Sequence, residues 1–187
     1  MKKSSSSVEI QLPHMASVKI GGELERREFA VIAGPCSIES LDQFRTAALS
    51  VKAAGATVLR GGIFKMRTNP SAFQGLGTTS FALIKEVKNE TQMPLCSEVM
   101  DPRQISDLVE VVDCFQVGSR NMYNYSLLLE LGQTKKPVML KRGLSATVEE
   151  WVLAAEYIMK GGGTDIIMCE RGIRTFETAT RNTLDIN

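Results

Sequence analysis

Residues 59–70, LRGGIFKMRTNP, begin as an apolar run and then place Arg60, Lys65 and Arg67 close together. Guanidinium and ammonium groups are well suited to bind phosphate and carboxylate oxygens. The stretch therefore predicts a buried strand whose carboxyl end holds an anion. The alternative is an exposed loop with ordinary surface charge, and the glycine pair does not have the spacing of a P-loop. The sequence on either side of this stretch is needed to distinguish the two interpretations.

Apolar runs like this one recur along the chain and alternate with segments of helical period, which predicts successive βα units and a parallel sheet. Polar side chains end or follow nearly every run. This favours an α/β barrel of the TIM (β/α)8 type over an open doubly wound sheet, in which such residues gather at one switch point. A full barrel has eight units, and about six are present here. The six runs are 29–33, 58–64, 94–99, 114–118, 137–141 and 165–169.

Three of the intervening segments carry helix signals. The first has apolar residues at helical spacing over 41–51 and a stop at Gly55. The second starts at Asp101 as its N-cap, and the third starts with a capping box formed by Thr147 and Glu150. The predicted buried positions of the second and third helices are Ile105, Leu108, Val109 and Val112, and Trp151, Ala154, Ala155 and Ile158.

Composition limits the class of protein. The 187 residues are 43% hydrophobic and 23% charged, as in an ordinary globular domain, and the formal net charge of +1 argues against nucleic acid or a membrane surface as a partner recognised by overall charge. No apolar run is long enough to span a bilayer, and the first residues lack the apolar centre of a secretory signal. We therefore expect a cytoplasmic protein with a mobile leader (1–17), a short strand or hairpin (18–28) and a partial barrel (29–187).

Six cations follow or end the predicted strands and would meet at one mouth of such a barrel. A buried cation is costly unless it is paired, so an anionic ligand is the natural counter-charge. Some of these cations should pair with Glu98 and Glu170, and the excess suggests more than one phosphate or carboxylate on the ligands. The six are Arg60, Lys65, Arg67, Arg120, Lys141 and Arg171.

Cys36, at the end of the first run, has three interpretations: a core thiol, a covalent nucleophile or a metal ligand. A nucleophile needs a nearby base, and the single histidine, His14, lies in the predicted leader. A metal site needs further donors, for which Glu98 and Glu170 are the neighbouring carboxylates. The four cysteines never form a CxxC pair, which argues against structural zinc and disulfides and predicts mostly small, reduced core residues.

Several motifs closely resemble those of a known family, over residues 29–187. The motifs resemble those of the phosphoenolpyruvate-dependent 3-deoxy-ketoaldonate synthases. Within this family they are most similar to the type I (beta class) 3-deoxy-D-arabino-heptulosonate 7-phosphate (DAHP) synthases. The sister octulosonate 8-phosphate synthases are similar at AGPCS but differ after Lys65 and lack the RNM that follows the fourth run. The motifs are IAGPCSIES (32–40), RGGIFKMRTNPSAFQGLG (60–77), SEVMD (97–101), VGSRNMYN (117–124), PVMLKRGLSAT (137–147) and CERGIRTFETATRNTLDI (169–186).

The resemblance implies a transferase that condenses phosphoenolpyruvate with erythrose 4-phosphate and releases phosphate, at the start of the shikimate route to chorismate and the aromatic amino acids. It also implies a divalent metal (Mn, Fe, Co or Zn type) with Cys36 as a ligand, and Lys65, Glu98 and Lys141 as catalytic residues, Glu98 near the attacking water. The implied contacts to phosphoenolpyruvate are Arg60, Arg120, Lys141 and Arg171, and those to erythrose 4-phosphate are Lys65, Arg67 and Thr68.

The chain also departs from the family pattern. Met66, Ser119 and Tyr123 replace the usual proline, alanine and glutamine, and the DPSH, EVH and LSDG segments that carry the other metal ligands are absent. We expect a C-terminally truncated synthase, either a fragment or a short homologue that completes its barrel by association, and therefore a homo-oligomer, a tetramer or dimer. The alternatives are a non-catalytic anion-binding or assembly homologue and an octulosonate 8-phosphate synthase.

Overall fold

The structure is a computed structural model that describes residues 18–20, 29–65, 67 and 69–186. Its centre is a six-stranded parallel sheet in which the strands follow one another in chain order. This confirms the predicted α/β fold with six strands of a (β/α) barrel, in which β1 and β6 are the two edges of the sheet. The strands are β1 (Ile32–Ala33), β2 (Val58–Arg60), β3 (Leu95–Val99), β4 (Cys114–Val117), β5 (Val138–Lys141) and β6 (Ile166–Cys169).

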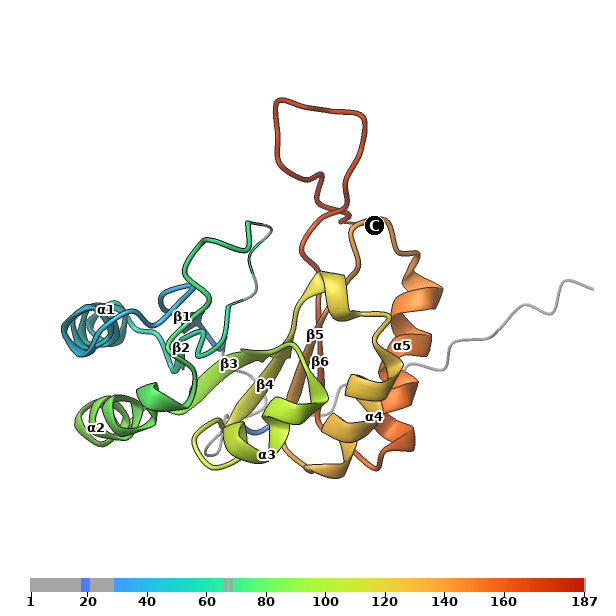
Figure 1. Ribbon diagram of the computed structural model, residues 1–187. Coiled ribbons are helices and arrows are strands. Elements are labelled where there is room, and N and C mark those ends of the chain that lie inside the picture. Colours follow the sequence, from blue (N-terminus) through green and yellow to red (C-terminus); the bar gives the residue numbers. More distant parts are fainter. Residues whose placement is uncertain (1–17, 21–28, 66, 68, 187) are drawn as a thin grey trace, which may run out of the picture.

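Helices connect successive strands and cover the outer side of the curved sheet (Figure 1). Each strand-to-strand connection is therefore a parallel crossover of the kind that a barrel requires. No described helix has both the length and the apolar composition needed to cross a membrane. The helices are α1 (Leu41–Ala53), α2 (Phe81–Thr91), α3 (Ile105–Leu108), α4 (Tyr125–Gln133) and α5 (Val148–Lys160), with short 3₁₀ turns at Gly77–Ser80, Pro102–Gln104 and Ser119–Asn121.

The two faces of the sheet have different roles because side chains alternate along each strand. Leu95 and Phe115 belong to the face that packs under the helices in the main hydrophobic core. Cys96 and Cys114, the next or preceding residues, belong to the opposite face and pack with Met139 in a second, smaller cluster. Both cysteines are fully buried, as predicted for core thiols.

The predicted helix starts are mostly confirmed. The helix predicted over 41–51 begins at Leu41, and its N-cap, which was not predicted, is Ser40, whose hydroxyl accepts a hydrogen bond from the Gln43 N–H. Thr147 and Glu150 form the predicted capping box of α5. The four predicted buried positions of α5 are Trp151, Ala154, Ala155 and Ile158, and all four are buried.

The helix predicted after Asp101 is much shorter than the pattern indicates. Asp101 does cap the segment, but its first three residues form a 3₁₀ turn and α3 has a single turn. Val111 is buried and Val109 only partly so, because the chain leaves the helix after Leu108 and turns toward β4.

The run predicted over 58–64 is also shorter as a strand, since β2 ends at Arg60. Beyond it, the Lys65 N–H donates to Gln74 O at 2.7 Å, and the Gly77 N–H donates to Ile63 O at 3.1 Å. These two hydrogen bonds join the beginning and the end of the loop that follows β2, so they do not extend the sheet. The apolar residue Ile63 is nevertheless fully buried, which explains why the run reads as a strand.

The predicted leader (1–17) lies outside the described residues, as does most of the predicted hairpin (18–28). Of the latter, residues 18–20 are described. Ile20 is 3% exposed and packs with Val58 and Met139 in the smaller cluster. This apolar layer lies on the sheet face that the helices leave open, and it underlies the site described next.

Candidate active site

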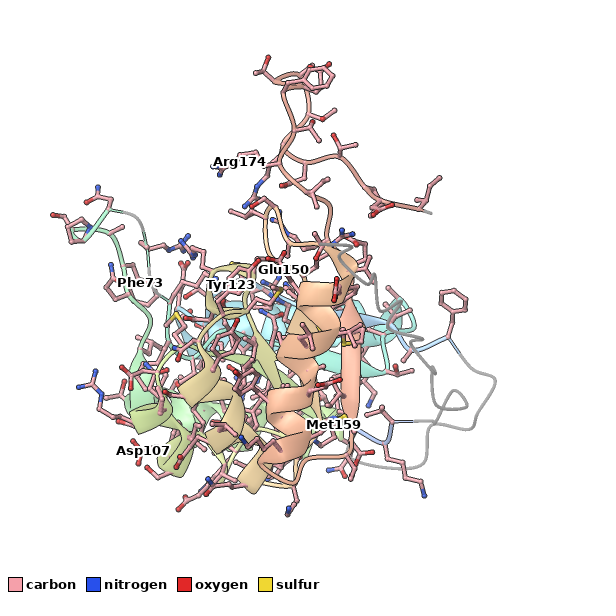
Figure 2. The ribbon with its side chains drawn as sticks, turned by 90° about the vertical axis from the view of Figure 1, so that its right-hand side faces the viewer. Phe73, Asp107, Tyr123, Glu150, Met159 and Arg174 are labelled. Atoms are coloured by element: carbon pink, nitrogen blue, oxygen red, sulfur yellow. The ribbon has the colours of Figure 1, made fainter. Side chains whose placement is uncertain are left out.

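A cavity of about 460 Å³ opens above the smaller cluster at the carboxyl ends of the strands. Residues from all six strands or from the loops that follow them contribute to its wall. Tyr123, Glu150 and Arg174 mark this end of the molecule in Figure 2, and Asp107 marks the opposite end. The lining residues are Cys36, Arg60, Lys65, Glu98, Gln116, Gly118, Ser119, Arg120, Lys141, Leu144, Arg171, Arg174, Arg181 and Asn182.

The alternation of strand residues explains which side chains reach the cavity. Arg60 lies two residues after Val58, Glu98 two after Cys96, and Lys141 two after Met139. Val58, Cys96 and Met139 form the apolar layer. Side chains two residues apart in a strand share a face, so the polar residues form the next layer toward the strand ends. The strands thus place a layer of apolar side chains directly below a layer of charged side chains.

The cavity wall is strongly basic. It contains seven Arg and Lys side chains and one carboxylate, that of Glu98. The Lys65 ammonium lies 2.8 Å from Glu98 Oε2, and the two side chains are only 11% and 13% exposed. This pair neutralises one of the seven cations. The remaining positive charge would be stabilised by an anionic ligand with more than one charge.

The same cations act on the Cys36 thiol. Burial by itself raises the pKa of Cys36, but the Lys65 ammonium and the Arg60 guanidinium offset it, so the net shift of that pKa is downward. A thiol in such an electropositive setting has more thiolate character than a core cysteine. Cys36 is exposed, unlike Cys96 and Cys114.

The structure brings most of the predicted site residues together. Five of the six predicted cations line the cavity, together with Glu98 and Cys36. The sixth, Arg67, is exposed and its backbone N–H donates to Gln74 Oε1 at 3.3 Å, outside the cavity lining. Thr68 lies outside the described residues. Glu170 does not line the cavity and pairs with Arg142 instead.

Sequence reasoning missed several residues of the cavity wall. Gln116 could have been found from the alternation, since it follows Cys114 by two and is paired in register with Glu98. Arg174, Arg181 and Asn182 lie far beyond the end of β6. Nothing in their local pattern indicates that they line the cavity, although they belong to the quoted motif at 169–186.

The described residues do not by themselves form a complete metal site. Zinc and similar ions take three or four donors from the protein, and Cys36, the predicted ligand, would supply one. No group of three His, Cys, Asp or Glu side chains that could hold a metal lies together in the described part of the chain. The charged groups that lower the pKa of Cys36 are the cations of Lys65 and Arg60, and such cations repel a divalent ion.

Comparison with known proteins gives consistent matches. The sequence model described as the DAHP synthetase I family matches residues 7–187. A phospho-2-dehydro-3-deoxyheptonate aldolase of Thermotoga maritima is 44% identical over 173 residues, which are 92% of this chain and 50% of that protein. A 2-dehydro-3-deoxyphosphooctonate aldolase of Geobacter sulfurreducens is 29% identical over 170 residues, 85% of this chain and 60% of that protein.

Solved structures agree with the sequence matches. The crystal structure of the Thermotoga maritima phospho-2-dehydro-3-deoxyheptonate aldolase (DAHP synthase) has a TM-score of 0.79 at 46% identity, over 84% of this chain and 45% of that one. A truncated form of the Thermotoga maritima synthase has a TM-score of 0.76 at 44% identity, over 84% of this chain and 57% of that one. The chain thus spans about half the length of the heptonate relatives it matches.

Proposed function

Since the chain belongs to the DAHP synthetase I family, we propose that it forms the substrate-binding part of a 3-deoxy-7-phosphoheptulonate synthase. This transferase joins phosphoenolpyruvate to erythrose 4-phosphate, with water as the third reactant, and yields DAHP and inorganic phosphate. The observation that carries the proposal is the cavity wall of seven basic side chains with one carboxylate. Both substrates are phosphorylated, and phosphoenolpyruvate also has a carboxylate.

Phosphoenolpyruvate is the better defined of the two ligands. In the proposal, Arg60, Arg120, Lys141 and Arg171 bind its phosphate and carboxylate, since Arg forks match both groups with paired hydrogen bonds. All four residues line the cavity. Holding the phosphate on fixed cations orients the enol carbon and stabilises the charge of the departing phosphate.

Lys65 and Glu98 are proposed to act at the reacting atoms. The enol carbon of phosphoenolpyruvate forms a bond to the aldehyde carbon of the aldose phosphate, water adds to the second carbon, and the bond from that carbon to the phosphate oxygen breaks. In the proposal, Glu98 accepts a proton from the water that adds to the second carbon. Lys65, whose ammonium lies 2.8 Å from Glu98 Oε2, donates a proton to the aldehyde oxygen, which becomes a hydroxyl group. The new hydroxyl on the second carbon then gives up its proton to the departing phosphate as the ketone forms. Arg67 and Thr68 stay the predicted contacts of the aldose phosphate.

The metal of such a synthase is a separate question. Cys36 stays the predicted ligand, and the described residues do not supply the further donors that a divalent ion requires. The steps above therefore use only side chains of this chain. An anion-binding homologue without catalysis is the second candidate, because the cations line the cavity while the described part of the chain lacks a group of three possible metal donors.

Titration calorimetry with phosphoenolpyruvate tests the binding proposal. Arg60→Met should raise Kd by roughly 10- to 100-fold, the effect of one lost charge-assisted hydrogen bond. Arg103→Met is the matched control, because it removes the same charge from a side chain that is 89% exposed and pairs with Asp101, away from the cavity lining. An unmodified chain that does not bind phosphoenolpyruvate would refute the proposal.

An activity assay separates the two candidates. Phosphate release from phosphoenolpyruvate plus erythrose 4-phosphate, measured with and without added Mn²⁺, supports the synthase. Binding without release under both conditions supports the anion-binding homologue. Inductively coupled plasma analysis of the purified chain reports whether it retains a metal.

The proposal also includes the assembly and location of the protein. Edge strands present unpaired N–H and C=O groups that favour association, and β1 and β6 are the edges of the described sheet. We therefore propose a homo-oligomer, a dimer or tetramer, in the cytoplasm. Light scattering during gel filtration measures the first, and a monomeric mass at all concentrations would contradict it.

A further inference from the structure

The segment 170–186 follows β6 and carries three of the arginines that line the cavity, Arg171, Arg174 and Arg181. We call it the arginine segment. It rises from the top of the sheet as a projecting loop (Figure 1). Its two limbs meet where the N–H groups of Ile173 and Thr183 each donate to the other residue's carbonyl oxygen at 2.9 Å.

Arg142 lies at the base of this segment and joins three parts of the chain. Its Nη1 donates to Glu170 Oε2 at 2.7 Å and to Asp185 Oδ2 at 2.9 Å, and its Nε donates to Ala146 O at 2.9 Å. Glu170 and Asp185 are the beginning and nearly the end of the arginine segment. The Arg142 residue is 5% exposed.

Glu170 connects Arg142 to Arg171 through hydrogen bonds. While its Oε2 is held by Arg142, its Oε1 accepts hydrogen bonds from the backbone N–H groups of Arg171 at 2.8 Å and Gly172 at 2.7 Å. The Arg171 guanidinium is held in turn by Asn182 Oδ1 at 2.6 Å, on the other limb. Every link from Arg142 to the Arg171 side chain is thus a hydrogen bond shorter than 3 Å.

Arg142 itself does not belong to the cavity wall. It is the first residue after β5 and is not among the residues that line the cavity, whereas Lys141, the last residue of β5, is. Its guanidinium is already neutralised by two carboxylates. Removing it would leave Glu170 and Asp185 as two acidic groups without their shared cation next to an anion-binding wall.

We propose that Arg142 is a positioning residue, which fixes both ends of the arginine segment so that Arg171, Arg174 and Arg181 face the bound phosphorylated acid. This inference rests on the proposed function for the identity of the ligand. The physical reason is that long Arg side chains on an untethered loop lose conformational entropy on binding, whereas a loop fixed in advance does not. The constraint therefore acts on ligand affinity through Arg171.

The sharpest variant is Asp185→Asn, which keeps the size of the side chain and removes the charge at the far end of the segment. Asp185 is 27% exposed at its side chain, so the core packing is not disturbed. Calorimetry with phosphoenolpyruvate should show a Kd raised about three- to tenfold, the effect of weakening one charge-assisted hydrogen bond. Arg103→Met should leave Kd unchanged. Arg142→Lys should bind more tightly than Arg142→Met, because it restores the cation.

A double-mutant cycle separates positioning from a general structural role. In an Arg171→Met background, Asp185→Asn should change Kd by less than about twofold, because residues that act through one another are not additive. A merely structural role predicts the same fold-change in both backgrounds. Full additivity, or an unchanged Kd in Asp185→Asn alone, would overturn the proposal.

Limited trypsin digestion gives a readout that does not depend on the ligand. Arg174 and Arg181 are exposed cleavage sites on the arginine segment. Cleavage there should be faster in Asp185→Asn than in the unmodified chain, with the α-helical far-ultraviolet signal unchanged. If the unmodified chain does not bind phosphoenolpyruvate, the proposed function fails. The digestion then decides the positioning role by itself, since equal cleavage rates would refute it.

Discussion

Gly34, in the AGPCS motif, is a position where one added methyl group should displace the backbone of Arg60, a residue that lines the cavity. A Cβ atom there would lie 2.1 Å from Arg60 O and 3.0 Å from Arg60 N. Both are backbone atoms of β2, which no change of rotamer can move. The residue also has φ of +146°, a conformation that side chains rarely adopt.

The magnitude of the Gly34→Ala effect follows from these contacts. Real Cβ atoms essentially never approach closer than 3.0 Å, and ordinary contact begins at 3.4 Å, so β1 and β2 must separate by about 1.3 Å at this point. Overpacking costs about 1–3 kcal/mol, and unfavourable φ costs about 1–2 kcal/mol more. We expect the free energy of unfolding to fall by about 2–5 kcal/mol, a large part of the 5–15 kcal/mol typical of domains.

Urea denaturation followed by tryptophan fluorescence and circular dichroism measures this loss. The matched control is Gly55→Ala, because Gly55 has φ of +92° but nothing lies within 4 Å of its added Cβ. That variant should lose only the backbone component, about 1–2 kcal/mol. Equal losses in the two variants would refute the steric argument. In the folded fraction, Gly34→Ala should also weaken phosphoenolpyruvate binding, because the displaced carbonyl belongs to Arg60.

Three further changes test the helices and the acid response. Thr147→Ala removes the hydroxyl that accepts from the Glu150 N–H at 3.1 Å and should cost about 0.5–2 kcal/mol in urea melts; Thr147→Ser should restore most of it. Phe44→Ala empties a fully buried site under α1 and should cost about 3–5 kcal/mol, and a loss no larger than that of Thr147→Ala would contradict the packing. Burial raises the pKa of Glu170, but its hydrogen bond from Arg142 and those from backbone N–H groups outweigh it, so the net pKa lies below the ordinary 4.5. The stabilising contribution of the Glu170 carboxylate is therefore present above pH 4.5 and is lost as the pH falls below it. Urea midpoints should fall as the pH drops below 4.5, and they should fall less steeply in Glu170→Gln. An equal dependence of the midpoint on pH in the two chains would argue against this role.

The sequence was sufficient for the order of the six strands and for their alternation with helices, although it gave specific start or stop signals for only three of the five helices. Apolar runs of strand length, separated by helical spacing and capping residues, depend on neighbours only a few positions away, and such local patterns survive without knowledge of the fold. The α5 capping box and its four buried positions are the clearest case. Where the pattern misled, at α3 and after Arg60, apolar residues are buried by loops instead of by regular elements.

The candidate site divides in the same way. The residues directly on the strands, such as Arg60, Glu98 and Lys141, could be placed from period-two alternation and from the family motifs. Neither the alternation nor the motifs could show which cations are paired with carboxylates. Lys65 and Glu98, whose side chains lie 2.8 Å apart, are separated by 33 positions in the sequence.

The sequence by itself thus determined a βα-repeating chain with cations at the strand ends, because those signals are local. Only the tertiary structure decided that residues 170–186 form a projecting loop, that Arg174 and Arg181 join the cavity wall, and that Arg142 pairs with Glu170 and Asp185 at the two ends of that loop. The reason is that loop paths depend on hydrogen bonds between residues distant in sequence. Arg142 and Asp185 are 43 positions apart, and no periodic pattern in the sequence indicates that they are in contact.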